Sequence, residues 1–316
     1  MCTAVSFKGK DNYFGRNLDL ERGYNECVVV TPRNYPFSMR TLPTIESHYA
    51  MIGMATVVED YPLYFEATNE TGLSMAGLNF PDNAHYNAYC EGKDNVTPFE
   101  FIPYILSKCK DIGEAKELLS GINLVNINFS EGLPLSPLHW IISDKEESVT
   151  VESVKDGLKI YDNPYGVLTN NPTFDYHLLN INNYMNLHEG IGENRISPKQ
   201  NLSTYSLGMG ALGLPGDYSS ASRFVRAVFI KEKSPCLEGE KESVSHFFHI
   251  LGGVAMPKGC VMTKSGEYEY TRYSSCCNAD KGIYYYTTYD NSTVTAVDMH
   301  SCDLEGSGIC EFALVE

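Results

Sequence analysis

The sequence has no long apolar run and no cluster of basic residues, and each absence removes a class of function. Among its 316 residues, 24 Lys and Arg stand against 40 Asp and Glu, so the formal net charge is −16. A field of that sign repels nucleic acid and anionic membrane surfaces. Because no stretch of about 18 apolar residues is present, we also expect no insertion into a membrane.

The ten cysteines lack the C-x-x-C spacing on which zinc knuckles and thioredoxin-type sites depend. The first residues also lack the basic and apolar regions of a secretory signal. We therefore expect a cytoplasmic protein with reduced thiols, in which Cys276 and Cys277 point to opposite faces of one strand. Neither H-E-x-x-H nor G-x-S-x-G occurs, so the main signals of zinc peptidases and serine hydrolases are missing.

Two further patterns are weak. Gly208–Gly213 matches the dinucleotide fingerprint G-x-G-x-x-G, but the polar stretch NLSTYS precedes it and LPG follows it. That fingerprint requires a strand before it and a helix after it, so we interpret the segment as a flexible glycine loop. His246 and His249 lie three residues apart on a predicted helix without a third ligand nearby, and we place them on the helix surface or in the core. No metal site is expected.

The strand and helix patterns alternate in blocks. Strand-like runs fill the first 80 residues, and CTAVSF has the alternation of a half-buried strand. Capping signals predict helices beginning at Thr97 and Asp111. Strands follow, with a hairpin at Asp156-Gly157, and residues 180–210 are polar and irregular. Helical patterns then return at 220–232 and 242–251, before three strand-like runs close the chain.

This order argues for an α+β protein. Strict βαβ alternation, which a doubly wound parallel sheet requires, is absent. Two mostly antiparallel sheets with helices packed outside them fit the order better. No break in composition and no repeat is visible, so we predict a single domain over residues 1–316.

Cys2 directly follows the initiator methionine. Either this position is incidental, or the thiol and the α-amino group of Cys2 together form a nucleophile and its base. A thiol reacts as its thiolate, which neighbouring cations favour. An α-amino group has a pKa of about 7.7–8.0 and can act as a general base. Arg16 could place a cation near the sulfur, and Asp19 could anchor the amine. Residues three apart, however, do not share a face of a regular strand. A twist, bulge or strand end would be needed, and a surface ion pair is the alternative.

Five motifs in register resemble the choloylglycine hydrolase family of bile salt hydrolases and penicillin V acylases. In order they are MCTAVSF, FGRNLDL, AGLNFP, GVLTNNPTFDYH and LPGDYSSASRF. The resemblance runs from Cys2 to about Asp298. It implies the N-terminal-nucleophile (Ntn) hydrolase fold, a four-layer αββα sandwich. It further implies that Met1 is removed, that Cys2 attacks an amide carbonyl, that its own amine moves the proton, and that no cofactor is needed.

The resemblance also assigns the site. Arg16 matches the family arginine near the sulfur, Asp19 the carboxylate that holds the amine, and Arg223 the arginine that completes the polar network. Asn79 and Asn170 match the asparagines of the oxyanion site. By matching positions, six residues are candidates to line the substrate pocket, each with core packing as the alternative: Leu18, Tyr24, Val58, Phe65, Phe129 and Leu133.

Within the family, Asn79 favours the bile salt hydrolases, because penicillin V acylases often have tyrosine at that position. We therefore predict hydrolysis of glycine- or taurine-conjugated bile acids through a thioester. One alternative is a penicillin V or N-acyl-homoserine-lactone acylase with the same residues, and another is a catalytically idle relative that binds steroid amphiphiles. The resemblance also implies a homotetramer, in which the segment around residues 186–210 reaches a neighbouring subunit.

Overall fold

Two large β-sheets and five α-helices make up the computed structural model, which describes residues 1–316. The seven-stranded sheet comprises β1 (Cys2–Lys8), β2 (Asn12–Leu20), β12 (Val167–Leu168), β13 (Val261–Met262), β14 (Tyr268–Asn278), β15 (Ile283–Thr288) and β16 (Thr295–Asp298). The eight-stranded sheet comprises β3 (Cys27–Thr31), β4 (Met51–Val58), β5 (Tyr61–Asn69), β6 (Ser74–Asn79), β9 (Leu138–Ser143), β10 (Ser148–Val154), β11 (Gly157–Asp162) and β17 (Cys310–Ala313). A short parallel pair, β7 (Asp94–Val96) and β8 (Ile122–Leu124), lies apart from both.

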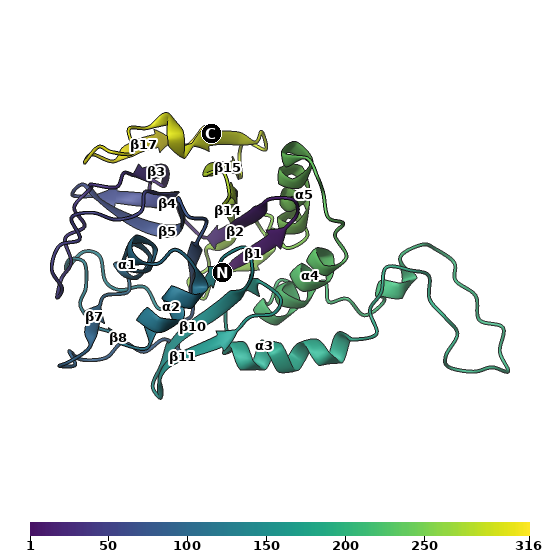
Figure 1. Cartoon of the computed structure of the whole chain (residues 1–316). Coiled ribbons are helices and arrows are strands. Elements are labelled where there is room, and N and C mark those ends of the chain that lie inside the picture. The colour runs from purple at the N-terminus through teal and green to yellow at the C-terminus, as the bar shows by residue number, and fades with distance from the viewer.

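The strand order is β12-β1-β2-β14-β15-β16 in the first sheet, with β13 beside β14, and β11-β10-β9-β6-β5-β4-β3-β17 in the second. Every pairing within these two sheets is antiparallel. The N-terminal strand β1 is therefore an inner strand of its sheet, and its first residue lies inside the molecule (Figure 1).

Helices cover the outer face of each sheet. α1 (Phe101–Lys108) packs on β5 and β6, and α2 (Ile112–Leu119) follows it. On the other side, α4 (Ser220–Glu232) and α5 (Glu240–Gly252) pack on the seven-stranded sheet, and α3 (Phe174–Asn180) packs on α4 (Figure 1). One core of 33 buried residues joins the two sheets to α4 and α5, and a second of 25 joins the eight-stranded sheet to α1 and α2. These four layers confirm the predicted αββα sandwich.

The helices show how far local signals determine boundaries. α4 occupies the predicted range, and Asp111 caps α2 by accepting from the Glu114 N–H at 2.9 Å. α1 begins at Phe101, so the predicted start at Thr97 is wrong. The Glu100 carboxylate does accept from the Thr97 N–H (3.0 Å), but the Thr97 hydroxyl has no partner and only half of the capping box forms. α3 was not predicted.

The remaining sequence patterns have ordinary structural explanations. The hairpin at Asp156-Gly157 joins β10 to β11, with Gly157 at φ +106°. Gly208–Gly213 contains only a 3-10 turn, Met209–Ala211, without the strand and helix of a dinucleotide site. His246 hydrogen-bonds the Ser234 hydroxyl at 2.7 Å, and all ten cysteines are free. No helix combines the length and apolar character needed to cross a membrane.

Candidate active site

Cys2 is the first residue of β1, and its position in the sheet decides which side chains reach its sulfur. It pairs with Leu18 on β2, while Arg16 pairs with Ala4. Side chains two apart on a strand share a face, so Cys2, Leu18 and Arg16 all face the eight-stranded sheet. Cys2 is 2 % exposed and Arg16 is 1 % exposed. The buried guanidinium and the thiol are thus diagonal neighbours on one face.

Arg16 is held from the opposite sheet. Its Nη1 donates to the Phe65 carbonyl at 3.1 Å and to the Gly77 carbonyl at 2.7 Å, and lies 3.7 Å from Oε2 of Glu66. It also contacts the Cys2 side chain. Burial alone would lower the pKa of Arg16, but its charge interactions with Cys2, Tyr273 and Glu66 raise the pKa above its usual range. The site therefore keeps a permanent cation beside the sulfur.

A β-bulge supplies one of these carbonyls. In the pairing of β4 with β5, Met54 lies opposite Glu66 and Ala55 opposite Tyr64, so Phe65 is the extra residue. Residues in a bulge leave the regular ladder, and the Phe65 carbonyl is free to accept from Arg16. The bulge thus explains how a strand carbonyl points at a side chain of the facing sheet.

Asp19 lies on the other face of β2, toward the helices. Its carboxylate is fully buried, accepts from the Thr271 hydroxyl at 2.6 Å, and lies 4.0 Å from Nη1 of Arg223. Burial raises the pKa of Asp19, and Arg223 opposes that shift. Arg16 and Asp19 therefore approach Cys2 from opposite faces. Arg16 contacts the Cys2 side chain, whereas the Asp19 carboxylate lies on the other face, where the charge of the N-terminal ammonium also opposes the rise in its pKa.

Arg223, on α4, connects the parts of the site. Its Nη1 donates to the Cys2 carbonyl and to the Thr3 hydroxyl (2.7 Å), Nη2 to Oδ1 of Asn170 (2.7 Å), and Nε to the Tyr218 carbonyl (3.0 Å). Burial lowers the pKa of Arg223, and the negative charge of Asp19 opposes that shift. With no exposed surface and every nitrogen paired, this guanidinium fixes the start of β1 against α4.

Asn170 faces the Cys2 nitrogen with its amide oxygen. Oδ1 accepts from the Cys2 N–H at 2.8 Å and from Arg223 at 2.7 Å, and two donors require that this atom be the oxygen. Nδ2 donates to the Asn79 carbonyl at 2.7 Å, and the Ser220 hydroxyl accepts from the Asn170 N–H at 2.8 Å. Asn170 thus links Cys2 to the end of β6.

Met1 is still attached in this structure, so the Cys2 nitrogen is a peptide nitrogen. The Met1 ammonium donates to the Asp19 carbonyl at 2.7 Å and contacts the Glu269 carboxylate, and burial lowers the pKa of this ammonium. Removal of Met1 would convert the Cys2 nitrogen into an α-amine that already faces the Asn170 oxygen. The geometry is therefore that of the unprocessed chain with the amine's acceptor already in place.

The structure does not bring Asn79 and the six pocket candidates together in one place. Asn79 ends β6, is partly exposed, and its side-chain amide forms no hydrogen bond within the protein. Leu18 is buried beside Cys2, and the exposed Tyr24 contacts the ring of Phe65 at 6.5 Å between centroids. Phe129 packs instead with Phe99 and Tyr61, whereas two candidates are only partly buried on β4 and a loop: Val58 and Leu133.

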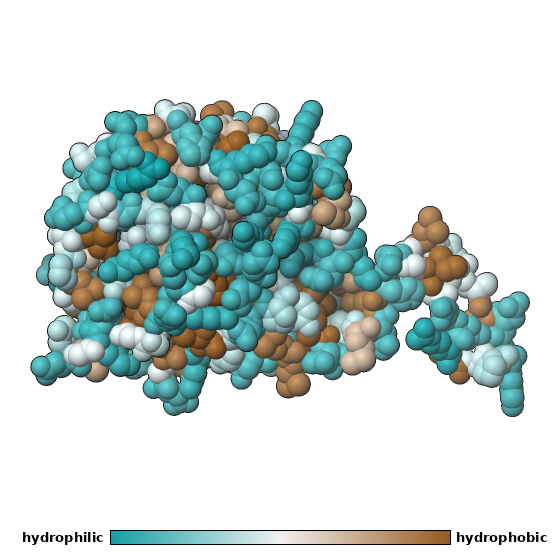
Figure 2. Space-filling view, in the orientation of Figure 1, coloured by the Kyte–Doolittle hydropathy of each residue, from teal (hydrophilic) through white to brown (hydrophobic).

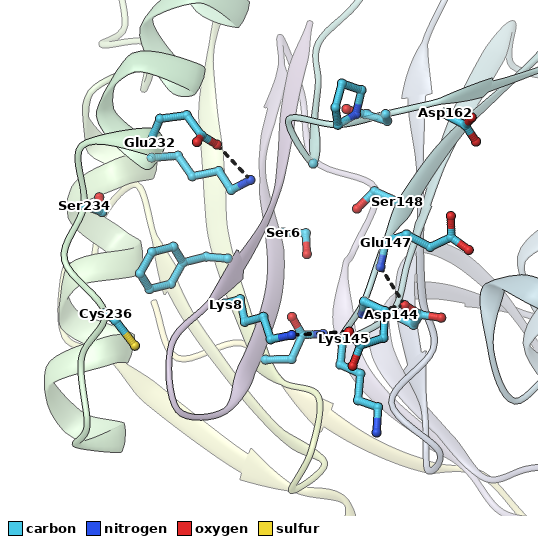
Figure 3. Close-up of a pocket in the computed structure, with 17 residues that line it drawn as sticks. Ser6, Lys8, Asp144, Lys145, Glu147, Ser148, Asp162, Glu232, Ser234 and Cys236 are labelled. Atoms are coloured by element: carbon cyan, nitrogen blue, oxygen red, sulfur yellow. Dashed lines mark hydrogen bonds and ion pairs between the residues drawn. The ribbon is translucent and has the colours of Figure 1, made fainter. Parts of the chain in front are cut away.

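One cleft lies away from Cys2. It has a volume of about 520 Å³ and lies at the other end of β1, where Ser6 and Lys8 face Asp144 and Glu147 across it (Figure 3). Only 2 of its 17 lining residues are hydrophobic. Such a polar lining does not match a site for a largely apolar ligand.

The structure adds four residues that the sequence did not indicate. Glu66 faces Arg16, Thr271 bonds Asp19, Ser220 holds Asn170, and the Tyr218 carbonyl accepts from Arg223. Tyr218 and Ser220 lie within the quoted motif LPGDYSSASRF, so that motif is a signal for them. Glu66 and Thr271 occur in ordinary strand patterns far from any motif, and only the sheet pairing brings them to the site.

Known proteins are similar to this chain in sequence. Residues 2–312 match the family described as "Linear amide C-N hydrolases, choloylglycine hydrolase family". The bile salt hydrolase/transferase of Lactiplantibacillus plantarum is 54 % identical over 99 % of this chain and 97 % of its own. That of Clostridium perfringens is 39 % identical over 98 % and 95 %.

Solved structures agree. The C2A mutant of the conjugated bile acid hydrolase from Clostridium perfringens superposes with a TM-score of 0.93 at 37 % identity, covering 100 % of this chain and 97 % of that one. A penicillin V acylase from Agrobacterium tumefaciens, with a TM-score of 0.78 and 22 % identity over 99 % and 91 %, shares the fold. On the family match and the relatives, this chain belongs to the choloylglycine hydrolase family of linear amide C–N hydrolases.

Proposed function

We propose that this protein is a bile salt hydrolase that cleaves the amide bond of glycine- or taurine-conjugated bile acids with Cys2 as its nucleophile. The observation that carries the proposal is the position of Cys2 at the start of β1, in contact with Arg16 and with its nitrogen on Asn170. Relatives at 54 % and 39 % identity are both named bile salt hydrolase/transferase, which supports this substrate class.

In the proposed mechanism, removal of Met1 gives Cys2 a free amine. That amine takes the thiol proton as the sulfur attacks the amide carbonyl, and then gives the proton to the leaving nitrogen of glycine or taurine. The bile acid stays attached as a thioester, and a water molecule attacks it with the amine again as base. The Asn170 oxygen orients the amine, and the buried Asp19 carboxylate stabilises its protonated form.

The tetrahedral oxyanion needs donors aimed at it. We assign Asn79 to this role, because its amide is partly exposed beside the site and has no partner within the protein. Asn170 gives one N–H of its Nδ2 group to the Asn79 carbonyl and retains a second N–H. One preorganised donor of this kind typically accounts for about 2.7–4 kcal/mol of the barrier.

The steroid would lie near the buried Leu18, with Tyr24 and Phe65 as an aromatic wall. We keep three further candidates for the pocket, although Phe129 is packed into a cluster with Phe99 and Tyr61: Val58, Phe129 and Leu133. No cofactor or metal enters the proposed reaction. The family match over residues 2–312 supports one domain, and ten free thiols support a cytoplasmic location.

Release of taurine from taurocholate, compared with release of phenoxyacetate from penicillin V, tests the proposal. We expect kcat/KM to be larger for taurocholate, because the relatives are named for bile salts. The same assay with free glycine or another amine present examines the transferase part of those names, since a thioester can pass its acyl group to an amine. Faster turnover of penicillin V would contradict the substrate assignment, and binding of taurocholate without turnover would indicate an idle relative.

We also propose that the protein is a homotetramer and that the arm, the segment around residues 186–210, contributes to its assembly. The arm projects from the body (Figure 1), and its base is closed by the backbone bonds His188 N–H to Gly210 O (3.1 Å) and Gly210 N–H to Gly190 O (3.0 Å). Beyond that base it carries exposed apolar side chains (Figure 2): Ile191, Ile196, Leu202, Tyr205 and Leu207. Such side chains gathered on a projecting segment are typical of an interface.

Replacing Ile196, Tyr205 and Leu207 together with serine is expected to reduce the assembly to monomers or dimers, because the three side chains are 85–89 % exposed in the single chain. Multi-angle light scattering measures the mass of each variant. A matched control replaces exposed apolar residues of the body, Ile160 and Met262, with serine and should leave the mass unchanged. A wild-type protein that is already monomeric would contradict the tetramer.

A further inference from the structure

Glu66 is a buried carboxylate that the mechanism above does not use. It lies on β5, is 1 % exposed, and faces the seven-stranded sheet. Oε1 accepts from the Ser275 hydroxyl at 2.9 Å and the Tyr284 hydroxyl at 2.5 Å, and Oε2 accepts from the Tyr273 hydroxyl at 2.8 Å. Burial raises the pKa of Glu66, while Arg16 and these hydroxyls oppose the shift. Because all four neighbours are donors, the group that matches them is the ionised carboxylate.

Stability alone does not explain this arrangement. Replacing a buried ion pair with well-packed apolar side chains is often neutral or stabilising, since desolvation of the charges offsets their attraction. The two sheets around Glu66 already share a core of buried apolar residues. Glu66 is a buried charge directly beside Arg16, the cation that contacts the nucleophile, so its position points to a role in the site.

Arg16 does not depend on Glu66 for its position. Its Nη1 is already bound by the backbone carbonyls of Phe65 and Gly77, at 3.1 and 2.7 Å, whereas Oε2 of Glu66 lies farther away at 3.7 Å. What Glu66 adds is negative charge. The guanidinium thus lies between two groups that it can stabilise as anions, the Glu66 carboxylate and the Cys2 thiolate.

We propose that Glu66 is a positioning residue for the nucleophile, acting through Arg16 by sharing the positive charge of the guanidinium with the Cys2 sulfur. The proposal rests on the proposed role of Cys2. A thiolate next to an uncompensated guanidinium forms at lower pH but attacks more weakly, because the nucleophilicity of a thiolate falls with the pKa of its thiol. Glu66 limits this effect and keeps the sulfur a strong nucleophile.

The other titratable groups nearby do not supply this charge. Burial, followed by the charge of Glu66, raises the pKa of Tyr273 and of Tyr284 well above the usual value, and burial raises the pKa of Cys277 to about 12. These three therefore stay neutral at working pH. On the face of the sheet opposite the sulfur, the charged groups near Cys2 are its own amino group, Asp19 and Arg223. Replacing Glu66 changes only the charge on the sulfur side.

The test is the pH dependence of alkylation of Cys2 by iodoacetamide, followed by peptide mass spectrometry, in wild type and Glu66→Gln. Loss of the carboxylate charge is expected to shift the acidic limb of the Cys2 profile to lower pH by roughly half to one unit, a shift smaller than that of a direct charge contact. At a pH below both pKa values, more of the sulfur is thiolate but each thiolate attacks more weakly, with a Brønsted coefficient of about 0.4–0.5, so alkylation should be about 2- to 4-fold faster. At a pH above both pKa values, where the sulfur is fully thiolate in both proteins, the kcat for taurocholate should fall while KM stays near the wild-type value.

Glu152→Gln is the matched control. Glu152 is equally buried and hydrogen-bonds His139 (3.0 Å) and the Phe174 N–H (3.0 Å), without contacting Arg16. It should change thermal stability but leave the Cys2 profile in place. An unchanged profile in Glu66→Gln, a shift to higher pH, or a wild-type Cys2 that iodoacetamide does not modify would each overturn the proposal. Alkylation needs no bile salt, so failure of the substrate assignment appears separately, as a reactive Cys2 without taurocholate turnover.

Discussion

Cys2→Ala is expected to reduce the kcat for taurocholate by about 10⁴-fold or more, because a covalent mechanism loses its bond-forming atom. The alanine keeps the main-chain nitrogen and carbonyl of residue 2, so the hydrogen bond to Asn170 and the contact of Arg223 with the start of β1 should survive. Product release is measured by liquid chromatography, and circular dichroism checks that the variant is folded.

Cys277→Ala is the matched control for this variant. Cys277 is as buried as Cys2, at 2 % exposure, but burial raises the pKa of its thiol to about 12, which makes it an inert side chain. We expect this control to retain turnover. Intact mass should show that the active wild-type protein has lost Met1. Full activity with Met1 attached, or in Cys2→Ala, would rule out the mechanism.

Arg223→Met is expected to lower the free energy of unfolding by about 3–5 kcal/mol, the usual cost of removing one partner from a buried charge pair. Methionine fills much of the space but leaves the Asp19 carboxylate without its cation. The Asn170 oxygen and the Cys2 carbonyl would each lose a donor as well. Urea denaturation followed by fluorescence measures the change, and turnover should fall because the Cys2 amine loses its orientation.

Arg226→Met separates this effect from the loss of any arginine of α4. Arg226 lies three residues along the same helix and donates only to backbone carbonyls, those of Pro215, Asp217 and Gly253. Its loss leaves no buried carboxylate unpaired, so we expect a smaller destabilisation of about 1–3 kcal/mol and near wild-type turnover. If Arg223→Met were as stable as wild type, Arg223 would not be the structural link described above.

The fold was predictable because its signals are local. The strand at CTAVSF, the cap at Asp111 and the block order of strands and helices each survive in the structure, although β1 is buried on both faces and not half-buried as its alternation predicted. The error at the start of α1 has a tertiary cause. At Thr97 the capping-box residues are present, but the Glu100 carboxylate also accepts from the Arg40 N–H of a distant loop, and the helix starts after it.

Site residues were predictable only where they lie within one of the quoted motifs. Composition and spacing left Arg16 and Asp19 as a possible surface ion pair, and their fully buried positions on opposite faces of β2 depend on the pairing of β1 with β2 and on the strand end. Glu66 and Thr271 each lie more than 45 residues after the end of β2 in the sequence. Contacts of this kind follow from sheet order and bulges, which no short sequence pattern specifies.

The strand-end position of Cys2 has an evolutionary consequence. Its sulfur belongs to the interior between the sheets, whereas its nitrogen meets Asn170 and its carbonyl meets Arg223 near the helix layer. Changes in the loops of the eight-stranded sheet can therefore alter which acyl group is accepted. The residues that orient the proton-transferring amine lie on the other side of Cys2 and stay the same. This separation explains in physical terms how one fold can come to recognise different substrates while the residues around its nucleophile are kept.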